Sequence, residues 1–462
     1  KPIIFFFIIF FSLCKYKRKQ TQYNLRYHTM NNIKLFNGDE INQKTILGHP
    51  SGLFTLFFTE MWERFSYYGM RAILVLFLIS SIDNEGWGWE RSDALVLYGW
   101  YTGLVYITPI FGGLIADRLI GYRKAVVYGA LLMTLGHAAM ALEVFYDFYL
   151  YVGLSLLILG NGLFKPNISS IVGQMYKDDG KIKDAAYTIF YMGINSGAFL
   201  GILLCGYIGE TVNWHYGFGL AGIFMLFGML QFHYGQNIFG SIGLKPIEKK
   251  DEKNLDVKEN QTPRKTIVDR LIVIGIFSFV TIFFWWGFEQ AGGSMTIFAN
   301  DYTNRDLMGT GALAFKIINS LLVIVPMIIL TIILYYLFNN TFQKYAISNI
   351  FLSLSFIIIW GIIIWMLNRE FVKDATEVPA SWFAILNSFF IIVFAPVLSK
   401  IWQSKFNPSG PVKFGIGLML LSIGFAILSY GSLSIPLGAS SASQSMIFLI
   451  LAYLFHTLGE LC

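Results

Sequence analysis

A long apolar stretch near the N-terminus, residues 53–80, carries four charged side chains: LFTLFFTEMWERFSYYGMRAILVLFLIS. A helix of about 20 apolar residues crosses the roughly 30 Å hydrocarbon core of a bilayer. Apolar stretches of that length recur to the end of the chain, which predicts an all-α, multi-pass membrane protein embedded in a lipid bilayer. The predicted spans are about 53–80, 94–116, 124–145, 149–171, 185–209, 215–235, 270–290, 315–338, 347–367, 382–402, 413–433 and a cut-off 446–462.

The composition supports this class. Of 462 residues, 55% are hydrophobic and only 13% are charged, whereas soluble domains carry about 25% charged residues. The net charge of +6 predicts no nucleic-acid partner, because membrane proteins concentrate Lys and Arg in cytoplasmic loops. Cys14, Cys205 and Cys462 form no pattern, and HExxH, CxxC and P-loop motifs are absent. We therefore expect a protein that is not an enzyme and that uses no metal or other cofactor.

The distribution of Lys and Arg between loops predicts the orientation. With a cytoplasmic N-terminus, the outer loops hold only Arg91, Arg305, Arg369 and Lys373, and the other loops hold many more basic residues. Basic residues favour the cytoplasmic side. The N-terminus is therefore expected inside the cell, with the protein in the cell membrane, and for a bacterium in its inner membrane.

A polar, highly charged connector after the sixth span divides the chain into two bundles. The stretch Tyr106–Gly113 faintly resembles Val393–Ser399, as expected for parallel repeats of six spans. Residues 1–29 precede Met30 and are expected not to be native. The predicted parts are a cytoplasmic leader at 1–52, a six-helix bundle at 53–235, a linker at 236–269, and an incomplete C-terminal bundle at 270–462 with an inserted helical pair at about 315–367.

Charges inside the predicted spans indicate function, because an ionisable group near the bilayer centre is costly and usually faces a cavity or a partner. In the first span, polar side chains recur at the spacing of a single helical stripe. The alternative is that Glu60 and Arg64 only neutralise each other and help helices pack, which leaves Glu63 and Arg71 unexplained. The stripe consists of Glu60, Glu63, Arg64, Tyr67, Tyr68 and Arg71.

Three more ionisable residues lie in later spans. Lys165 is in the fourth span, Glu289 in the seventh and Glu460 in the last. An alternative for Lys165 is that its side chain extends to the membrane interface. An alternative for Glu289 and Glu460 is that each carboxylate simply faces water. A cavity between the bundles would be cationic on one wall and anionic on the other, which suits a zwitterion. Tyr106, Asn195 and Asn387 could add neutral hydrogen bonds, although a lone intramembrane Asn often only joins helices.

The buried carboxylates also suggest an energy source. A carboxylate that exchanges a cationic partner for a proton can bias a protein between two packings. Since the sequence contains no ATP-binding motif, an ion gradient is the expected driving force. Glu residues beside fixed cations favour protons over sodium.

The stretch Glu60-Met-Trp-Glu-Arg-Phe-Ser-Tyr-Tyr-Gly69 resembles the ExxERFxYYG motif of the proton-dependent oligopeptide transporters, a branch of the major facilitator superfamily. The stretch Phe190–Leu200 resembles that family's fifth-helix signature, and Gly113–Arg118 is similar to the superfamily's loop between the second and third helices. The resemblance covers about residues 47–462. It implies two six-helix bundles and proton-coupled symport of di- and tripeptides.

The resemblance also implies roles for individual residues. Glu60 and Glu63 would take part in proton coupling with Lys165 as their partner, while Arg64 and Lys165 would receive the peptide carboxylate. Arg71 and Glu289 would form an outer gate. The peptide amine would be held by Glu460, Asn195 and Asn387, and the pocket would be lined by Tyr67, Tyr68 and Tyr106.

The chain departs from the family pattern in two respects. The inserted pair follows the seventh core helix, whereas the central linker is its usual place. Core helices eleven and twelve are missing, so we expect a C-terminally truncated transporter; whether it transports in this form is left open by the sequence.

Two other functions fit less well. A nitrate or other small-anion carrier of the same superfamily is the main alternative, but it has no need for the acidic Glu60, Glu63 and Glu460. An intramembrane enzyme would need a nucleophile or a His–Asp arrangement, and His137 and His456 are isolated on apolar spans. Peptide side-chain preference, proton stoichiometry and oligomeric state do not follow from the sequence.

Overall fold

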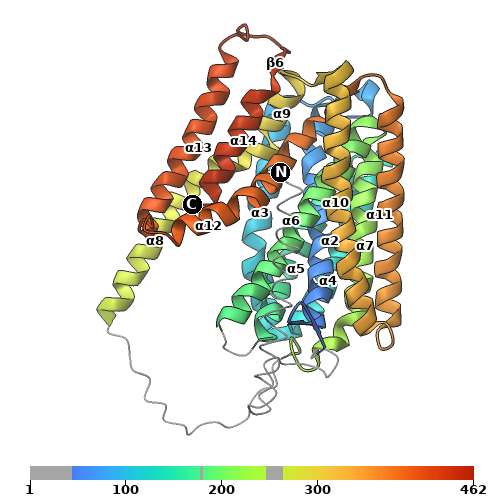
Figure 1. The fold of residues 1–462 in the computed structure, drawn as a ribbon, viewed down its shortest axis with the longest axis vertical. Coiled ribbons are helices and arrows are strands. Elements are labelled where there is room, and N and C mark those ends of the chain that lie inside the picture. The colour runs from blue at the N-terminus through green and yellow to red at the C-terminus, as the bar shows by residue number, and fades with distance from the viewer. Residues whose placement is uncertain (1–43, 177–179, 246–263) are drawn as a thin grey trace. The chain divides into compact units, whose positions relative to one another are not determined.

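A computed structural model of the protein describes residues 44–176, 180–245 and 264–462. Each predicted span corresponds to a helix, which confirms an all-α membrane protein (Figure 1). The helices are α2 (Ser51–Ile79), α3 (Arg91–Ile115), α4 (Tyr122–Ala141), α5 (Phe148–Gln174), α6 (Gly180–Thr211), α7 (Trp214–Gly235), α8 (Arg264–Phe288), α9 (Ser294–Asp301), α10 (Gly309–Thr341), α11 (Ala346–Val372), α12 (Ile385–Trp402), α13 (Gly410–Ser432) and α14 (Met446–Glu460).

Short elements join the long helices. A π-helical turn, η3 (Ala116–Ile120), extends α3, and the other short helices are of the 3₁₀ type. Strands pair as β1 (Thr45–Ile46) with β2 (His49–Pro50), β3 (Thr303–Asn304) with β6 (Gln444–Ser445), and β4 (Asp306–Leu307) with β5 (Thr376–Glu377). The 3₁₀ helices are η2 (Ile82–Asn84), η4 (Glu143–Phe145), η5 (Gln236–Phe239), η6 (Glu289–Gly292) and η7 (Ala380–Ala384).

Among the described residues, ten helical segments are long and apolar enough to cross a membrane. Helix α2 is not one of them, although it has 29 residues. Its four charged side chains raise its polarity above that of an ordinary span. Every residue of α2 except Tyr68 and Ile79 is buried, so the protein shields this helix from lipid.

The chain forms two compact units. The first unit comprises Lys1–Lys245 and Arg305–Phe389, and the second comprises Pro246–Asn304 and Phe390–Cys462. Residues 1–43, most of the predicted leader, lie outside the described residues, as do 246–263 in the predicted linker. Helix α8 begins at Arg264, within the segment predicted as linker.

Helices α2 and α6 make a close contact in the first unit, through glycines spaced four residues apart. A Cβ atom at Gly197 would lie 2.1 Å from the carbonyl oxygen of Met61, and one at Gly201 would lie 2.2 Å from that of Phe65. Gly193 faces Phe57 in the same way. Such small residues let two membrane helices approach until their backbones touch. The close approach holds the charged stripe of α2 inside the unit.

The inserted pair, α10 and α11, packs onto the N-terminal helices. The ring of Phe356 on α11 lies 5.6 Å from that of Phe58 and 5.8 Å from that of Trp62, both on α2. Phe351 stacks on Tyr234 of α7 at 5.7 Å. The pair therefore packs as part of the first unit. The domain division predicted from the sequence had assigned residues 315–367 to the C-terminal bundle. Side-chain complementarity decides this partner, and chain order does not.

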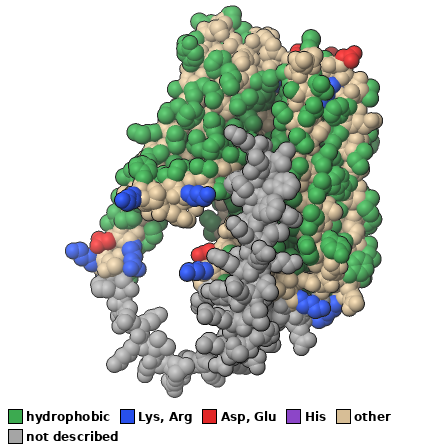
Figure 2. All heavy atoms as spheres, in the orientation of Figure 1, with side chains coloured by type: hydrophobic (Ala, Val, Ile, Leu, Met, Phe, Trp, Pro, Cys, Tyr) green, Lys and Arg blue, Asp and Glu red, His purple; other side chains and the backbone are tan. Residues whose placement is uncertain are grey.

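The outer surface of the inserted pair is apolar. Figure 2 shows hydrophobic side chains covering the side of the first unit where Figure 1 places α10 and α11, with charged groups toward the ends. In a bilayer these side chains face lipid tails. The exposed residues include Ile317, Ile328 and Ile332 of α10 and Ile350, Ile357 and Ile364 of α11.

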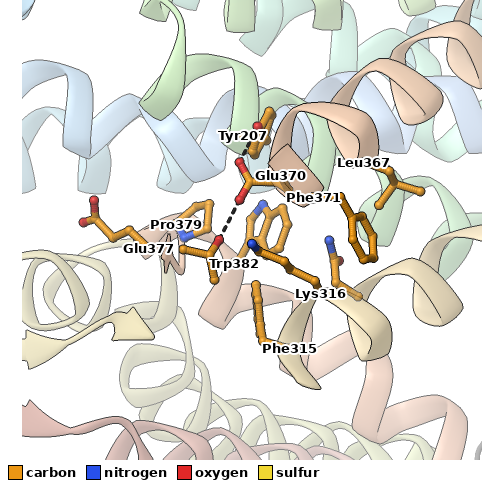
Figure 3. A pocket seen from close by; sticks show the side chains of 11 residues that line it. Tyr207, Phe315, Lys316, Leu367, Glu370, Phe371, Glu377, Pro379 and Trp382 are labelled. Atoms are coloured by element: carbon orange, nitrogen blue, oxygen red, sulfur yellow. Dashed lines mark hydrogen bonds between the residues drawn. The ribbon is translucent and has the colours of Figure 1, made fainter. Parts of the chain in front are cut away.

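A polar network fastens one end of the pair to α6. Glu370 at the end of α11 accepts hydrogen bonds from the hydroxyls of Tyr207 on α6 and Thr376 on β5, each at 2.6 Å (Figure 3). The ammonium of Lys373 also donates to Glu370 at 2.6 Å. Because the carboxylate of Glu370 is buried, each of these donors offsets its loss of hydration. The network joins α6, α11 and β5.

In the second unit, α13 and α14 pack through glycines. A Cβ atom at Gly417 would lie 2.8 Å from the carbonyl oxygen of Gly459, and one at Gly424 would meet the ring of His456. The hydroxyl of Tyr453 on α14 donates to the carbonyl of Ala291 in η6 at 3.1 Å. These contacts join α13, α14 and η6.

Replacing Gly197 by Ala should destabilise the first unit. The added methyl group would overlap the backbone of α2, and overpacking of this kind costs about 1–3 kcal/mol. We expect the unfolding midpoint of the detergent-purified protein to fall. The control is Gly103→Ala on α3, where the added methyl group meets no atom within 4 Å. Equal midpoints for the two variants would contradict close packing of α2 and α6.

Replacing Tyr207 by Phe should loosen the end of α11. The substitution removes one of three donors to a buried carboxylate, and hydrogen bonds to charged groups contribute about 1.5–3 kcal/mol. We expect faster hydrogen–deuterium exchange in residues 366–372. Tyr216→Phe is the matched control, since Tyr216 is 65% exposed at the start of α7. Unchanged exchange in the Tyr207 variant would show that the network does not hold α11.

Candidate functional site

The charged stripe of α2 forms a compact ionic triad. The Nε of Arg64 lies 2.7 Å from Oε1 of Glu60 and 2.8 Å from Oε2 of Glu63. All three side chains are at most 4% exposed. The helix brings Glu60 to Arg64 by its i, i+4 spacing, while Glu63 precedes Arg64 directly. Two carboxylates thus share one guanidinium in a water-poor interior.

Helix α5 supplies two further polar groups to this triad. The amide of Asn161 donates to Oε1 of Glu63 at 3.2 Å. Lys165, one turn further along α5, attracts Glu63 electrostatically, and its ammonium lies 4.8 Å from the ring centre of Tyr106 on α3. A cation over an aromatic ring is stabilised by the ring quadrupole. We call Glu60, Glu63, Arg64, Asn161 and Lys165 the charged cluster.

Sequence analysis predicted four members of the charged cluster and missed Asn161. A signal was available, because Asn161 precedes Lys165 by four residues and therefore shares its face of α5. A lone Asn in an apolar span often only joins two helices. The spacing to Lys165 therefore does not distinguish a functional Asn161 from one that serves packing. Only the position of α5 against α2 assigns Asn161 to Glu63.

The other end of the stripe is aromatic. The Nε of Arg71 donates to the hydroxyl of Tyr98 on α3 at 2.6 Å, and its guanidinium lies 6.0 Å from the ring centre of Tyr68. The ring of Tyr67 lies 5.1 Å from Tyr68 and 6.4 Å from Tyr101 of α3. Sequence analysis missed Tyr98 and Tyr101, which lie three residues apart on the buried face of α3.

The remaining predicted residues lie elsewhere. The amide of Asn195 on α6 donates to the carbonyl of Tyr191 at 3.0 Å, an intrahelical bond typical of a packed Asn. Asn387 is half-buried in α12 of the first unit, and Glu289 and Glu460 are half-buried in the second unit, in η6 and at the end of α14. Contacts within the first unit thus connect Glu60, Glu63, Arg64, Tyr67, Tyr68, Arg71, Tyr106 and Lys165.

The contacts of the charged cluster are those of ion pairs. Among the described residues, no three His, Cys, Asp or Glu side chains gather in the manner of a metal site. No donor within the described ranges reaches Oε2 of Glu60, although this oxygen is buried. Glu60 therefore keeps one buried carboxylate oxygen that takes no part in holding Arg64.

Known proteins resemble the chain over most of its length. A family model described as the POT family matches residues 123–254 and 355–462. A di-/tripeptide transporter of Lactococcus lactis subsp. cremoris is 35% identical over 91% of this chain and 82% of its own length. A peptide transporter of Yersinia enterocolitica subsp. palearctica is 33% identical over 91% of this chain and 81% of its own length.

Solved structures agree with these relatives. A peptide transporter in complex with alafosfalin superposes with a TM-score of 0.64 at 29% identity, covering 91% of this chain and 81% of that one. A POT family transporter in complex with 5-aminolevulinic acid gives a TM-score of 0.65 at 26% identity, covering 91% of this chain and 83% of that one. The fold is that of the major facilitator superfamily, and the chain belongs to the POT family of membrane transporters.

Proposed function

We propose that the protein is a secondary active symporter that imports di- and tripeptides together with protons by alternating access. The observation that carries this proposal is the buried triad in which Glu60 and Glu63 share Arg64, beside Asn161 and Lys165. Membership of the POT family and the names of its relatives, di-/tripeptide and peptide transporters, support the substrate class. The two ligands in the similar structures support a binding site for small amino-bearing acids.

Proton coupling follows from the charge balance of the triad. Glu60, Glu63 and Arg64 together carry a net charge of −1 when both carboxylates are ionised, and uncompensated charge is costly inside a membrane protein. Lys165 compensates it in the absence of substrate. When a peptide carboxylate draws Lys165 or Arg64 away, a proton on Glu60 or Glu63 restores neutrality. Peptide and proton therefore bind together, with the proton gradient as the only energy source and no cofactor.

The remaining roles follow the chemistry of a peptide. Arg64 and Lys165 bind its carboxylate, because charge-assisted hydrogen bonds to carboxylates are strong. Arg71 and Glu289 act as an outer gate. The amine is bound by Glu460, Asn195 and Asn387, and the peptide backbone contacts Tyr67, Tyr68 and Tyr106.

The proposed location is the cell membrane, which in a bacterium is the inner membrane, with the N-terminus in the cytoplasm. Short loops on one side carry most of the basic residues, and such loops stay in the cytoplasm. In this orientation α4, α6 and α11 end at the outer surface, where α7 begins.

Glu60→Gln should abolish gradient-driven uptake. The variant retains an oxygen for Arg64 but cannot ionise, so the triad no longer needs a proton. We expect wild-type proteoliposomes to accumulate labelled dialanine only with an inward proton gradient, and the variant to show exchange without accumulation.

Insertion and folding of this variant are checked by its elution and unfolding midpoint in detergent. If folded wild-type protein transports no di- or tripeptide, the peptide proposal fails, and nitrate and other small anions are tested next. Accumulation by Glu60→Gln equal to that of the wild type would instead remove Glu60 from proton coupling.

Arg64→Lys should reduce uptake about tenfold or more. One guanidinium nitrogen contacts both carboxylates, and the compact ammonium of Lys does not reproduce this planar geometry. Losing one charged hydrogen bond costs about 1.5–3 kcal/mol. The matched control is Arg270→Lys on α8, where the side chain is exposed. Uptake by Arg64→Lys as fast as by the control would show that positive charge alone suffices.

A further inference from the structure

An open apolar groove of about 680 Å³ lies in the first unit, away from the charged cluster. It is formed by the ends of α4, α6 and α11 and the start of α7. Its volume falls within the range of about 300–1,000 Å³ found for small-ligand sites. The lining residues are Ala141, Val144, Ile208, Val212, Asn213, His215, Tyr216, Gly219, Leu220, Ile223 and Trp365.

The groove opens on the outer surface of the membrane-spanning helices, where lipid surrounds the protein. Val144 is 58% exposed, Ile223 45% and Trp365 44%. The helices that form its walls are all candidate membrane spans. Apolar side chains exposed on such a surface meet lipid tails, so a hydrocarbon chain is the molecule available to occupy the groove.

The polar groups at the mouth of the groove mostly contact one another. The carboxylate of Glu143 lies 2.8 Å from Nδ1 of His215 and accepts a hydrogen bond from the indole of Trp87 at 2.9 Å. The side chain of Asn213 caps α7 by accepting from the backbone amide of His215 at 2.8 Å. The carboxylate of Glu143 is thus held by His215 and Trp87, and the amide of Asn213 also donates to the exposed carboxylate of Glu85.

One cation beside the groove is positioned without a carboxylate partner. The guanidinium of Arg369 lies 5.5 Å from the ring centre of Trp365. It donates to the hydroxyl and the carbonyl of Thr211 at 3.2 and 3.0 Å. Within the described residues no carboxylate forms an ion pair with Arg369. Both Thr211 bonds go to neutral acceptors, and the guanidinium also lies 5.8 Å from the ring centre of Tyr207, so it is held beside the apolar groove without a direct ion pair to any described residue.

We propose that this groove binds one phospholipid, with an acyl chain against Trp365 and Ile223 and the phosphate on Arg369. An apolar groove with a guanidinium against one of its lining residues, Trp365, matches the two chemical parts of a phospholipid, since Arg binds phosphate by charge-assisted hydrogen bonds. Trp and Arg at the end of a span also match the interfacial depth of a headgroup. The groove lies where α11 of the inserted pair meets α4, α6 and α7.

The test is to fill the groove at Gly219. A Cβ atom there has Ala141 as its nearest neighbour at 3.8 Å, so Gly219→Leu extends into the groove without disturbing the helix backbone. Gly219→Ala is the matched control, because it also replaces the helical Gly but leaves most of the groove empty. Native mass spectrometry of the purified full chain, titrated with phosphatidylglycerol, counts the bound lipid.

We expect one phosphatidylglycerol to bind the wild type and Gly219→Ala alike, and Gly219→Leu to bind it at least tenfold more weakly. Arg369→Gln should weaken phosphatidylglycerol by a similar factor while leaving diacylglycerol of the same chains unchanged. Matching unfolding midpoints for the two Gly219 variants exclude misfolding as the cause.

Three results would overturn the proposal. Equal phosphatidylglycerol binding by Gly219→Leu and Gly219→Ala would show that the groove holds no specific lipid. Equal binding of phosphatidylglycerol and diacylglycerol by the wild type would show that Arg369 does not recognise phosphate. A change from dimer to monomer in Gly219→Leu, measured by light scattering, would make a second copy of the chain the occupant. The readout is lipid binding, so it does not depend on peptide transport.

Discussion

The shared ion pair of Arg64 with Glu60 and Glu63 constrains the whole first unit. Each charge placed at the centre of a membrane helix costs about 2.5–3.5 kcal/mol on insertion scales. Helix α2 carries four, and it is stable in a bilayer only when other helices cover it. The structure meets this requirement by burying nearly all of α2, by pairing Glu60 and Glu63 with Arg64, and by bonding Arg71 to Tyr98 of α3. The same arrangement leaves the triad one negative charge in excess, which is the basis for the proposed proton coupling.

The packing around α2 follows from this requirement. Glycines on α6 allow its backbone to touch that of α2, and α5 brings Asn161 to Glu63. The inserted pair adds a further layer, with Phe356 against Trp62 and Glu370 fastened to α6 through Tyr207. Alternating access requires bundles that stay intact while they move. In the first unit, tight glycine contacts join α2 to α6, and a buried polar network joins α6 to α11.

Much of the site was predictable because its chemistry is conspicuous. Four charges in one apolar span leave few interpretations, and helical spacing alone places Glu60, Arg64 and Arg71 on one stripe. Asn161 and Tyr98 were not predicted, because a neutral polar side chain is far less unusual in an apolar span than a charge. Neutral polar residues are tolerated in many membrane helices, so their importance depends on the partner that folding brings to them. Asn195 shows the same ambiguity, because its amide bonds within its own helix.

The membrane spans can be predicted from the sequence, because crossing a bilayer sets a minimum apolar length that is visible in any single segment. The sequence also indicates that the charges of α2 need shielding. Which helices provide this shielding depends on packing, which brings α10 and α11 against the N-terminal helices although they follow α8 in the chain. The order of helices along the chain says little about which helices pack together. Their packing depends on the three-dimensional fit of side chains such as Phe356 against Phe58. A linear pattern does not contain that shape.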